Sequence, residues 1–267
     1  MFDQNLPPNQ LEAERRVRPR AGRSYVIFFT PRSGSSWLTD ICERSGRLSR
    51  PDECFNPQFM PRMTRALGAR NMPEYVELLQ RRRNTHGVYG CQITYHQLQA
   101  VFADEAAFLA HFPQAPVFWL IRKDIVAQAV SLAKMVATSV SHSALNSNDE
   151  ITASDRSFDY DPAAIRHWLD HILMAERQTE AMLARHGIAP LRISYEGMTA
   201  MGEAGAVARI AQGIGVAPPG DASTGSAHRK IATAKNQDFA QRFHDDAAAY
   251  LAEIDDERAP WLTLCAP

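Results

Sequence analysis

Short apolar runs recur along the chain, and each is followed by a polar turn and then by apolar positions at helical spacing. Four runs are rich in β-branched and aromatic residues and predict buried strands, at residues 25–29, 88–95, 117–121 and 190–195. Strands that alternate with helices form parallel sheets, because a crossover must return the chain before the next strand begins. The pattern therefore predicts an α/β fold in three layers, with helices on both faces of a parallel sheet.

The helices and loops between these strands are predicted from periodicity and composition. Apolar residues at helical spacing follow the first strand and recur over residues 98–109, 125–140, 162–186 and 204–214. Residues 141–161 are polar and rich in Ser, Asn and Asp, which predicts a mobile loop or lid. Residues 215–237 predict a second long loop before a C-terminal helix.

The N-terminal segment differs from the rest of the chain. Residues 1–23 hold three prolines and five arginines without an apolar core, which predicts a disordered leader and excludes a secretory signal. No run approaches the roughly 18 apolar residues of a membrane span. No internal boundary is visible, so we expect residues 24–267 to form one domain.

Composition narrows the possible partners and the compartment. The chain has 267 residues, of which 45% are hydrophobic and 22% charged, as in ordinary globular proteins. A net charge of −1 gives no global attraction to nucleic acid or to anionic membranes, so any anion site must be local. The four cysteines show no paired or metal-ligand spacing, which predicts reduced thiols and a cytoplasmic location.

The turn after the first strand, Pro-Arg-Ser-Gly-Ser-Ser-Trp at residues 31–37, has the residue types of an anion cradle. Gly34 permits a tight bend, Arg32 supplies a permanent cation, and helix N-termini present amide groups to anions. The alternative is a capped helix start without a ligand. The turn lacks the Gly-Lys-Ser/Thr of a triphosphate-binding loop, which favours a less charged transferred group such as sulfuryl, with no need of a metal.

Four segments, in order along residues 24–245, resemble a known enzyme family. The turn at residues 31–38 resembles the 5′-phosphosulfate loop of sulfotransferases that use 3′-phosphoadenylyl sulfate (PAPS), and residues 121–131 resemble their 3′-phosphate segment. Residues 50–55 and 230–242 resemble the acidic segment and the basic C-terminal loop of the bacterial trehalose 2-sulfotransferase family. The resemblance implies a P-loop NTPase-like three-layer fold and PAPS as the donor.

The resemblance also implies roles for individual residues. Glu53 would be the general base, and its neighbour Asp52 would either raise the pKa of Glu53 or point away. The implied donor-binding residues are Arg32, Ser33, Gly34, Ser35, Ser36, Trp37, Arg122, Ser131, Lys230 and Lys235. Arg32 would also stabilise charge on the leaving oxygen during a direct in-line transfer. Lys230 and Lys235 are equally compatible with an ordinary charged loop.

The sequence says least about the acceptor and the oligomeric state. The resemblance implies a carbohydrate acceptor, which is trehalose or another glycoside or glycolipid sugar, and a homodimer. Candidates for the acceptor pocket match only loosely and are Phe55, Gln128, Lys134, Thr138 and His142. Gln92 stands where some related proteins have lysine.

Two alternative functions compete with sulfuryl transfer. A small-molecule kinase on a similar fold is disfavoured by the missing triphosphate-loop lysine. A non-catalytic nucleotide- or anion-binding module would keep the turn but would need no base. A metal site is not expected, because His167 and His171 lie four residues apart on a predicted helix without an evident third ligand.

Overall fold

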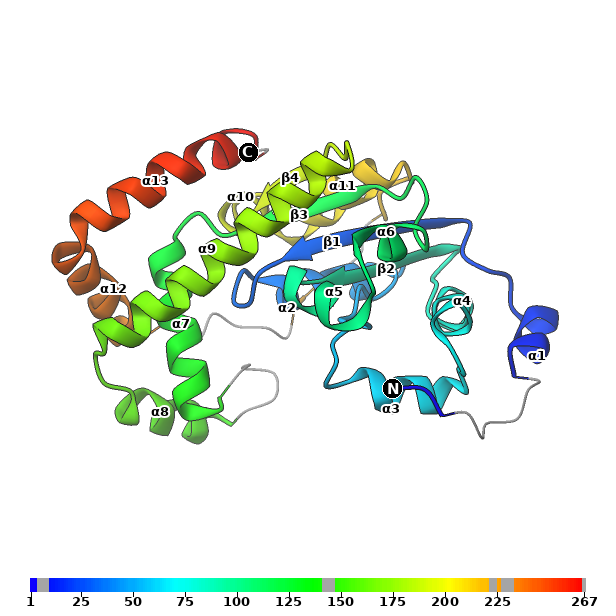
Figure 1. The fold of residues 1–267 in the computed structure, drawn as a ribbon, viewed down its shortest axis with the longest axis horizontal. Coiled ribbons are helices and arrows are strands. Elements are labelled where there is room, and N and C mark those ends of the chain that lie inside the picture. The colour runs from blue at the N-terminus through cyan, green and yellow to red at the C-terminus, as the bar shows by residue number, and fades with distance from the viewer. Residues whose placement is uncertain (4–9, 141–146, 221–224, 227–232, 266–267) are drawn as a thin grey trace.

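Four parallel strands form the centre of the computed structural model, which describes residues 1–3, 10–140, 147–220, 225–226 and 233–265. The strands are β1 (Arg23–Phe29), β2 (Val88–Ile93), β3 (Val117–Ile121) and β4 (Leu191–Ser194), and their order in the sheet is β2-β1-β3-β4 (Figure 1). This arrangement confirms the predicted α/β fold with a central parallel sheet. Lys230 and His142 lie outside the described residues.

Strand β1 runs through the middle of the sheet and is buried on both faces. It pairs in parallel with β2 and with β3, so that Phe28 lies opposite Ile93 on one side and Trp119 on the other. The carboxyl ends of β1 and β3 therefore lie next to each other. Such a point, where neighbouring connections leave in opposite directions, is where open parallel sheets bind ligands.

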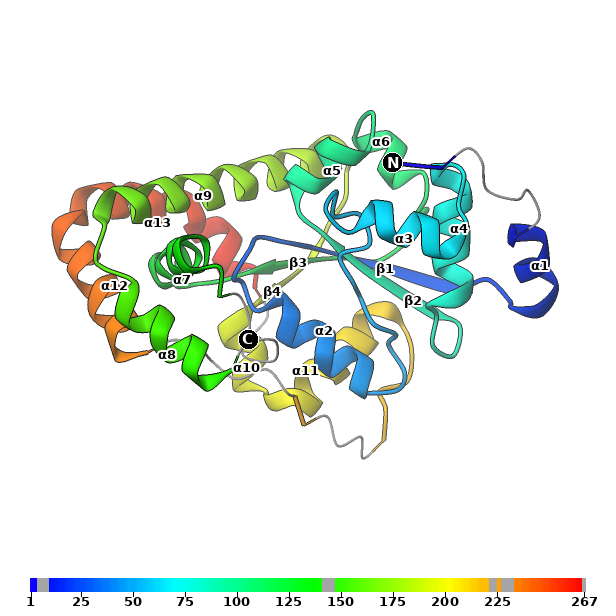
Figure 2. The same cartoon turned by 90° about the horizontal axis from the view of Figure 1, so that it is seen from below.

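The two faces of the sheet are covered by different sets of helices (Figure 2). One face packs against α2 (Ser35–Arg44), α10 (Tyr195–Ala200) and α11 (Gly202–Ile214). The other packs against α3 (Met60–Leu67), α4 (Met72–Arg82), α5 (Tyr95–Val101), α6 (Glu105–Leu109) and the last turns of α9 (Pro162–Arg185). Alternate residues of β1 pack into the two hydrophobic cores, because successive side chains of a strand point to opposite faces of the sheet.

A third apolar cluster lies beyond the carboxyl ends of the strands and contains only helical and loop residues. It joins α7 (Ile125–Thr138), the first half of α9, α12 (Ala234–Asp246) and α13 (Ala248–Thr263) (Figure 1). These helices therefore stand beside the edge at which β1 and β3 end. Among the helices in the described part of the chain, none combines the length and apolar character needed to cross a bilayer.

Helix caps explain two departures from the predicted elements. Residues 141–161 were expected to form a loop, but they contain α8 (Asn148–Ser157), where Ser147 and Glu150 form a reciprocal capping box. The helix expected over residues 98–109 is divided into α5 and α6. The carboxylate of Asp104 accepts the amide of Ala107 at 2.7 Å and starts the second helix. Both caps are local signals that the apolar pattern does not show.

The segment expected to be a disordered leader contains α1 (Gln10–Val17). No residue of α1 is fully buried, and ion pairs connect the helix to α4. Arg15 contacts Glu77 with two nitrogens at 2.8 Å, and Glu14 lies 2.9 Å from Arg82. Composition could not predict this helix, because its acidic and basic partners come from residues more than 60 positions away.

These ion pairs predict an acid-sensitive contribution to stability. The hydrogen bond from Arg15, supported by Arg81, lowers the pKa of Glu77 from its ordinary 4.5 to about 2. A depressed folded-state pKa gives stability that is present above the unfolded-state value and lost as pH falls toward the folded-state value. Glu77→Gln should therefore lower the free energy of unfolding at pH 7, with the gap to wild type closing between pH 4.5 and about 2. Urea titrations of both proteins across this pH range test the prediction. A difference in the free energy of unfolding that does not change with pH would contradict it.

Candidate donor site

The turn between β1 and α2 has a backbone that few sequences can adopt. Gly34 has φ 89° and forms the N-cap of α2, so the helix begins without a side-chain cap. A Cβ atom at this position would lie 2.2 Å from Cδ2 of Tyr195. Arg32 also has a positive φ, 65°, which is uncommon for a residue with a side chain. The uncapped amino end of α2 is thus presented at the carboxyl end of β1, where it suits an anion.

Ser33 supplies a polar group that the described protein residues leave unused. The side chain is completely buried, and its hydroxyl has no hydrogen-bond partner among the described residues. Buried hydroxyl groups are nearly always paired, so an exception at a candidate ligand site requires an explanation. This hydroxyl belongs to the turn itself, between Arg32 and Gly34.

Two arginines from neighbouring strand ends meet at this turn. Arg122, which follows β3 directly, donates from Nη1 to the backbone carbonyl of Arg32 at 3.2 Å. Nε of Arg32 donates to Oγ of Ser131 on α7 at 3.0 Å. The structure therefore brings together three residues that lie 9 to 99 positions apart and that the sequence assigned to the donor.

The electrostatics of the arginine pair favour a bound anion. Burial lowers the pKa of Arg32, and the positive charge of Arg122 lowers it further. An arginine remains cationic under these conditions, and the nearest carboxylate in the described part of the chain is that of Glu196, whose Oε1 lies 4.0 Å from Nε of Arg122. A ligand with phosphate or sulfate groups would bring negative charge to these two guanidinium groups and accept hydrogen bonds from arginine N–H groups.

Residues at the end of β4 complete the site and were missed by sequence analysis. The Tyr195 ring packs against the backbone of Gly34, and the guanidinium carbon of Arg122 lies 5.5 Å from the ring centroid. The carboxylate of Glu196 accepts the amides of Lys123 at 2.9 Å and of Asp124 at 3.3 Å. Tyr195 is the last residue of the strand predicted at residues 190–195 and Glu196 follows it, a position that signals a site in a parallel sheet.

Gln128 supports the turn from α7. Its fully buried side chain donates from Nε2 to Oγ1 of Thr30 at 2.9 Å and to the carbonyl of Pro31 at 2.7 Å. Gln128 is one of the candidates for the acceptor pocket that match only loosely in the sequence. The structure instead uses it to connect α7 with the start of the anion-binding turn.

Two other candidates for the acceptor pocket are buried by contacts with other parts of the protein. Phe55 is fully buried among the rings of Tyr75, Phe102, Phe108 and Phe112, so its expected place in a pocket is wrong. Lys134 is 5% exposed, and its Nζ lies 2.7 Å from Oδ1 of Asp155 on α8. Neither side chain is available to a sugar in this arrangement.

Glu53 lies in the loop after α2 and is held by neutral donors. Its Oε2 accepts from Nε2 of Gln97 at 2.6 Å and from Nδ2 of Asn56 at 3.0 Å. The side chain is partly exposed. Hydrogen bonds from amides fix the direction of a carboxylate without neutralising its charge.

Asp52 points away from Glu53. Its two carboxylate oxygens pair with Arg50, at 2.5 Å, and with Arg83. Of the two alternatives that the sequence left open, the structure therefore has the one in which Asp52 points away. Asp52 also connects the loop to the sheet, because its backbone carbonyl accepts the amide of Gln92 on β2 at 3.1 Å.

The side chain of Gln92 anchors the same loop to α2. Its Nε2 donates to Oγ1 of Thr39 at 2.9 Å, and that hydroxyl donates to the carbonyl of Pro51 at 3.0 Å. Since Ile93, the next residue, lies opposite Phe28, Glu53 is held at the same edge of the sheet as the anion-binding turn.

Of the two lysines predicted to close over the donor, Lys230 lies outside the described residues, and Lys235 contacts the end of α8. Nζ of Lys235 donates to the backbone carbonyl of Asp155 at 2.9 Å and lies 3.4 Å from that of Arg156, at the end of α8. Contact of Lys235 with a phosphate stays a prediction.

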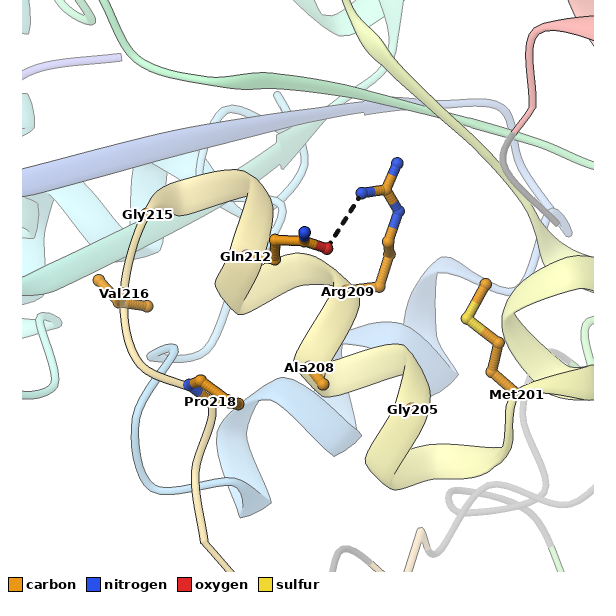
Figure 3. Close-up of a pocket in the computed structure, with 8 residues that line it drawn as sticks. All are labelled: Met201, Gly205, Ala208, Arg209, Gln212, Gly215, Val216 and Pro218. Atoms are coloured by element: carbon orange, nitrogen blue, oxygen red, sulfur yellow. Dashed lines mark hydrogen bonds between the residues drawn. The ribbon is translucent and has the colours of Figure 1, made fainter.

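A surface hollow of about 670 Å³ lies elsewhere, along α11 and the segment after it (Figure 3). Its lining residues are Met201, Gly205, Ala208, Arg209, Gln212, Gly215, Val216 and Pro218. None of these belongs to the arginine pair or to the loop of Glu53, so the hollow is separate from the candidate donor site.

Comparison with known families agrees with the geometry of the site. A family model described as Stf0 sulphotransferase matches residues 24–246, from β1 to the end of α12. No curated protein sequence matches the chain. The match covers most of the chain and includes the anion-binding turn, Glu53, Arg122 and Ser131. The chain therefore belongs to the Stf0 sulphotransferase family.

Proposed function

We propose that the chain transfers a sulfuryl group from PAPS to a hydroxyl group of a carbohydrate, such as trehalose or another glycoside or glycolipid sugar. The observation that carries this proposal is the pair Arg32 and Arg122, which meet at the carboxyl ends of β1 and β3, next to Ser33, whose hydroxyl has no hydrogen-bond partner within the described part of the chain. This is a compact group of cation, amide and hydroxyl donors, and PAPS carries a phosphosulfate and a separate 3′-phosphate for it to bind.

The donor contacts are divided between the two strand ends. Arg32, the Ser33 hydroxyl and the amides of residues 34–37 hold the 5′-phosphosulfate, while Arg122 and Ser131 hold the 3′-phosphate. Lys235 and Lys230 close over the nucleotide from the C-terminal segment. A sulfuryl group bears less negative charge than a terminal phosphoryl group, so arginine and backbone donors suffice to stabilise its transfer.

The reaction is a single in-line displacement. Glu53 accepts the proton of the acceptor hydroxyl as the oxygen attacks sulfur. The new bond joins that oxygen to sulfur, and the bond between sulfur and the bridging phosphate oxygen breaks. Arg32 stabilises the negative charge that develops on the leaving oxygen, and the products are a sulfate ester and adenosine 3′,5′-bisphosphate.

The activity is tested with PAPS labelled with sulfur-35, offered with trehalose, other glycosides and glycolipid sugars in buffer that contains EDTA. We expect label to move to at least one sugar without a divalent metal. Transfer of phosphate from ATP that requires magnesium would support a kinase instead. Binding of the bisphosphate without transfer to any sugar would support a nucleotide-binding module.

A further inference from the structure

A fully buried ion pair lies directly behind the candidate 3′-phosphate site. Arg258 on α13 and Glu176 on α9 are both 0% exposed. Nε of Arg258 lies 2.8 Å from Oε2 of Glu176, and Nη2 lies 3.2 Å from Oε1. The two contacts form the fork that a guanidinium makes with an ionised carboxylate.

The same guanidinium holds the backbone of the turn that carries Arg122. Nη2 of Arg258 donates to the carbonyl of Arg122 at 2.6 Å, and Nη1 donates to the carbonyl of Lys123 at 3.0 Å. The amide of Lys123 donates to Oε2 of Glu196 at 2.9 Å. The turn between β3 and α7 is therefore fixed through both its carbonyl groups and its amide groups.

Stability alone does not explain such a pair. Two charges lose their hydration when they are buried, and apolar side chains of similar volume often stabilise a fold as well or better. What a guanidinium supplies, and a methionine does not, is several directional donors in one rigid plane. Here those donors are divided between one carboxylate and two consecutive carbonyl groups beside a candidate ligand-binding residue.

We propose that Arg258, oriented by Glu176, is a positioning residue that holds Arg122 in the geometry needed to bind the 3′-phosphate of the nucleotide. The proposal rests on the proposed function, since it assumes that Arg122 binds this phosphate. It also gives α13 a role in donor recognition. Arg258 lies beyond residue 246, where the match to the family ends.

The test compares adenosine 3′,5′-bisphosphate with AMP, which lacks the 3′-phosphate, by calorimetric titration in EDTA. The double variant Glu176→Met/Arg258→Met removes both charges and fills a similar volume. We expect the ratio of the two affinities to fall at least about tenfold, since misplacement of a binding group by about 1 Å is costly. The affinity for AMP should stay within about twofold of wild type, because AMP does not use the displaced group.

A second ion pair between the same helices provides the control. Arg177 on α9 and Glu257 on α13 make two contacts of 2.6 Å, but the arginine side chain is 48% exposed and contacts neither carbonyl. Arg177→Met should leave the affinity ratio unchanged. If the double variant does not fold, Arg258→Lys replaces it: the lysine keeps the charge beside Glu176 but not the planar fork, and the ratio should again fall.

The outcomes separate this inference from the proposed function. A wild-type protein that binds the bisphosphate no better than AMP would overturn the role of Arg122 and with it the proposed donor site. A wild-type preference for the bisphosphate that persists in folded Arg258 variants would overturn the positioning role alone.

Discussion

Glu53→Gln is expected to lower the rate of sulfuryl transfer by a factor on the order of 10² to 10⁴, because the amide cannot accept the proton of the attacking hydroxyl. The affinity for adenosine 3′,5′-bisphosphate should not change, since Glu53 contacts Gln97 and Asn56 and not the arginine pair. Single-turnover transfer and calorimetric titration measure the two effects separately.

Asp52→Asn is the matched control for this change. This variant also replaces a carboxylate by the corresponding amide, at the adjacent residue, but the carboxylate of Asp52 is paired with Arg50 and Arg83. Surface pairs of this kind contribute little, so transfer should stay within a few-fold of wild type. Equal losses of transfer rate in the two variants would show that the substitutions act by disturbing the loop and not by removing the carboxylate of Glu53. Full activity in Glu53→Gln would remove this residue from the mechanism.

Gly34→Ala should destabilise the protein by about 3 kcal/mol and abolish measurable binding of the bisphosphate. A side chain at positive φ costs about 1–2 kcal/mol, and insertion of an atom into a packed site costs about 1–3 kcal/mol. Here the new Cβ would lie 2.2 Å from Cδ2 of Tyr195, so the turn and the ring must separate. Urea denaturation and titration with the bisphosphate measure the two losses.

Gly187→Ala separates backbone strain from this collision. Gly187 has a similar positive φ of 61°, and a Cβ there would meet nothing within 4 Å. We expect this variant to lose about 1 kcal/mol and to bind the bisphosphate normally. If Gly34→Ala cost no more than Gly187→Ala, then packing against Tyr195 would not shape the donor turn.

The strands were predictable because burial on both faces leaves a direct trace in the sequence. The run at Val117–Ile121 is a strand with the predicted limits, and the first, second and fourth strands differ from prediction by at most two residues at either end. The anion-binding turn was visible for a similar reason. Its glycine, serines and arginine are consecutive, so their chemistry could be inferred before their positions were known.

The residues that support the turn could not be predicted, because their partners are distant along the chain. Gln128 contacts Thr30 and Pro31 across more than 90 residues, and Arg258 contacts Arg122 across 136. A glutamine or an arginine on a helix gives no local sign of such a contact. Only the folded chain shows which carbonyl groups these side chains reach.

The contacts of the loop that carries Asp52 and Glu53 could not be predicted from the sequence either. Asp52 and Glu53 are adjacent, and the sequence could not decide whether they interact. The decision depends on Arg83, which lies 31 residues away at the end of α4 and takes one oxygen of Asp52. Glu53 is left with the neutral amides of Gln97 and Asn56.

The central claim, that the β1–α2 turn and Arg122 bind a nucleotide with 5′- and 3′-anionic groups, is tested most directly by thermal unfolding, with the bisphosphate added in EDTA and ATP added with magnesium in buffer without a chelator. At a concentration about 100 times its dissociation constant, adenosine 3′,5′-bisphosphate should raise Tm by about 5–10 °C, and ATP with magnesium should have little effect. A shift that appears only with ATP and magnesium, with none from the bisphosphate, would contradict the account.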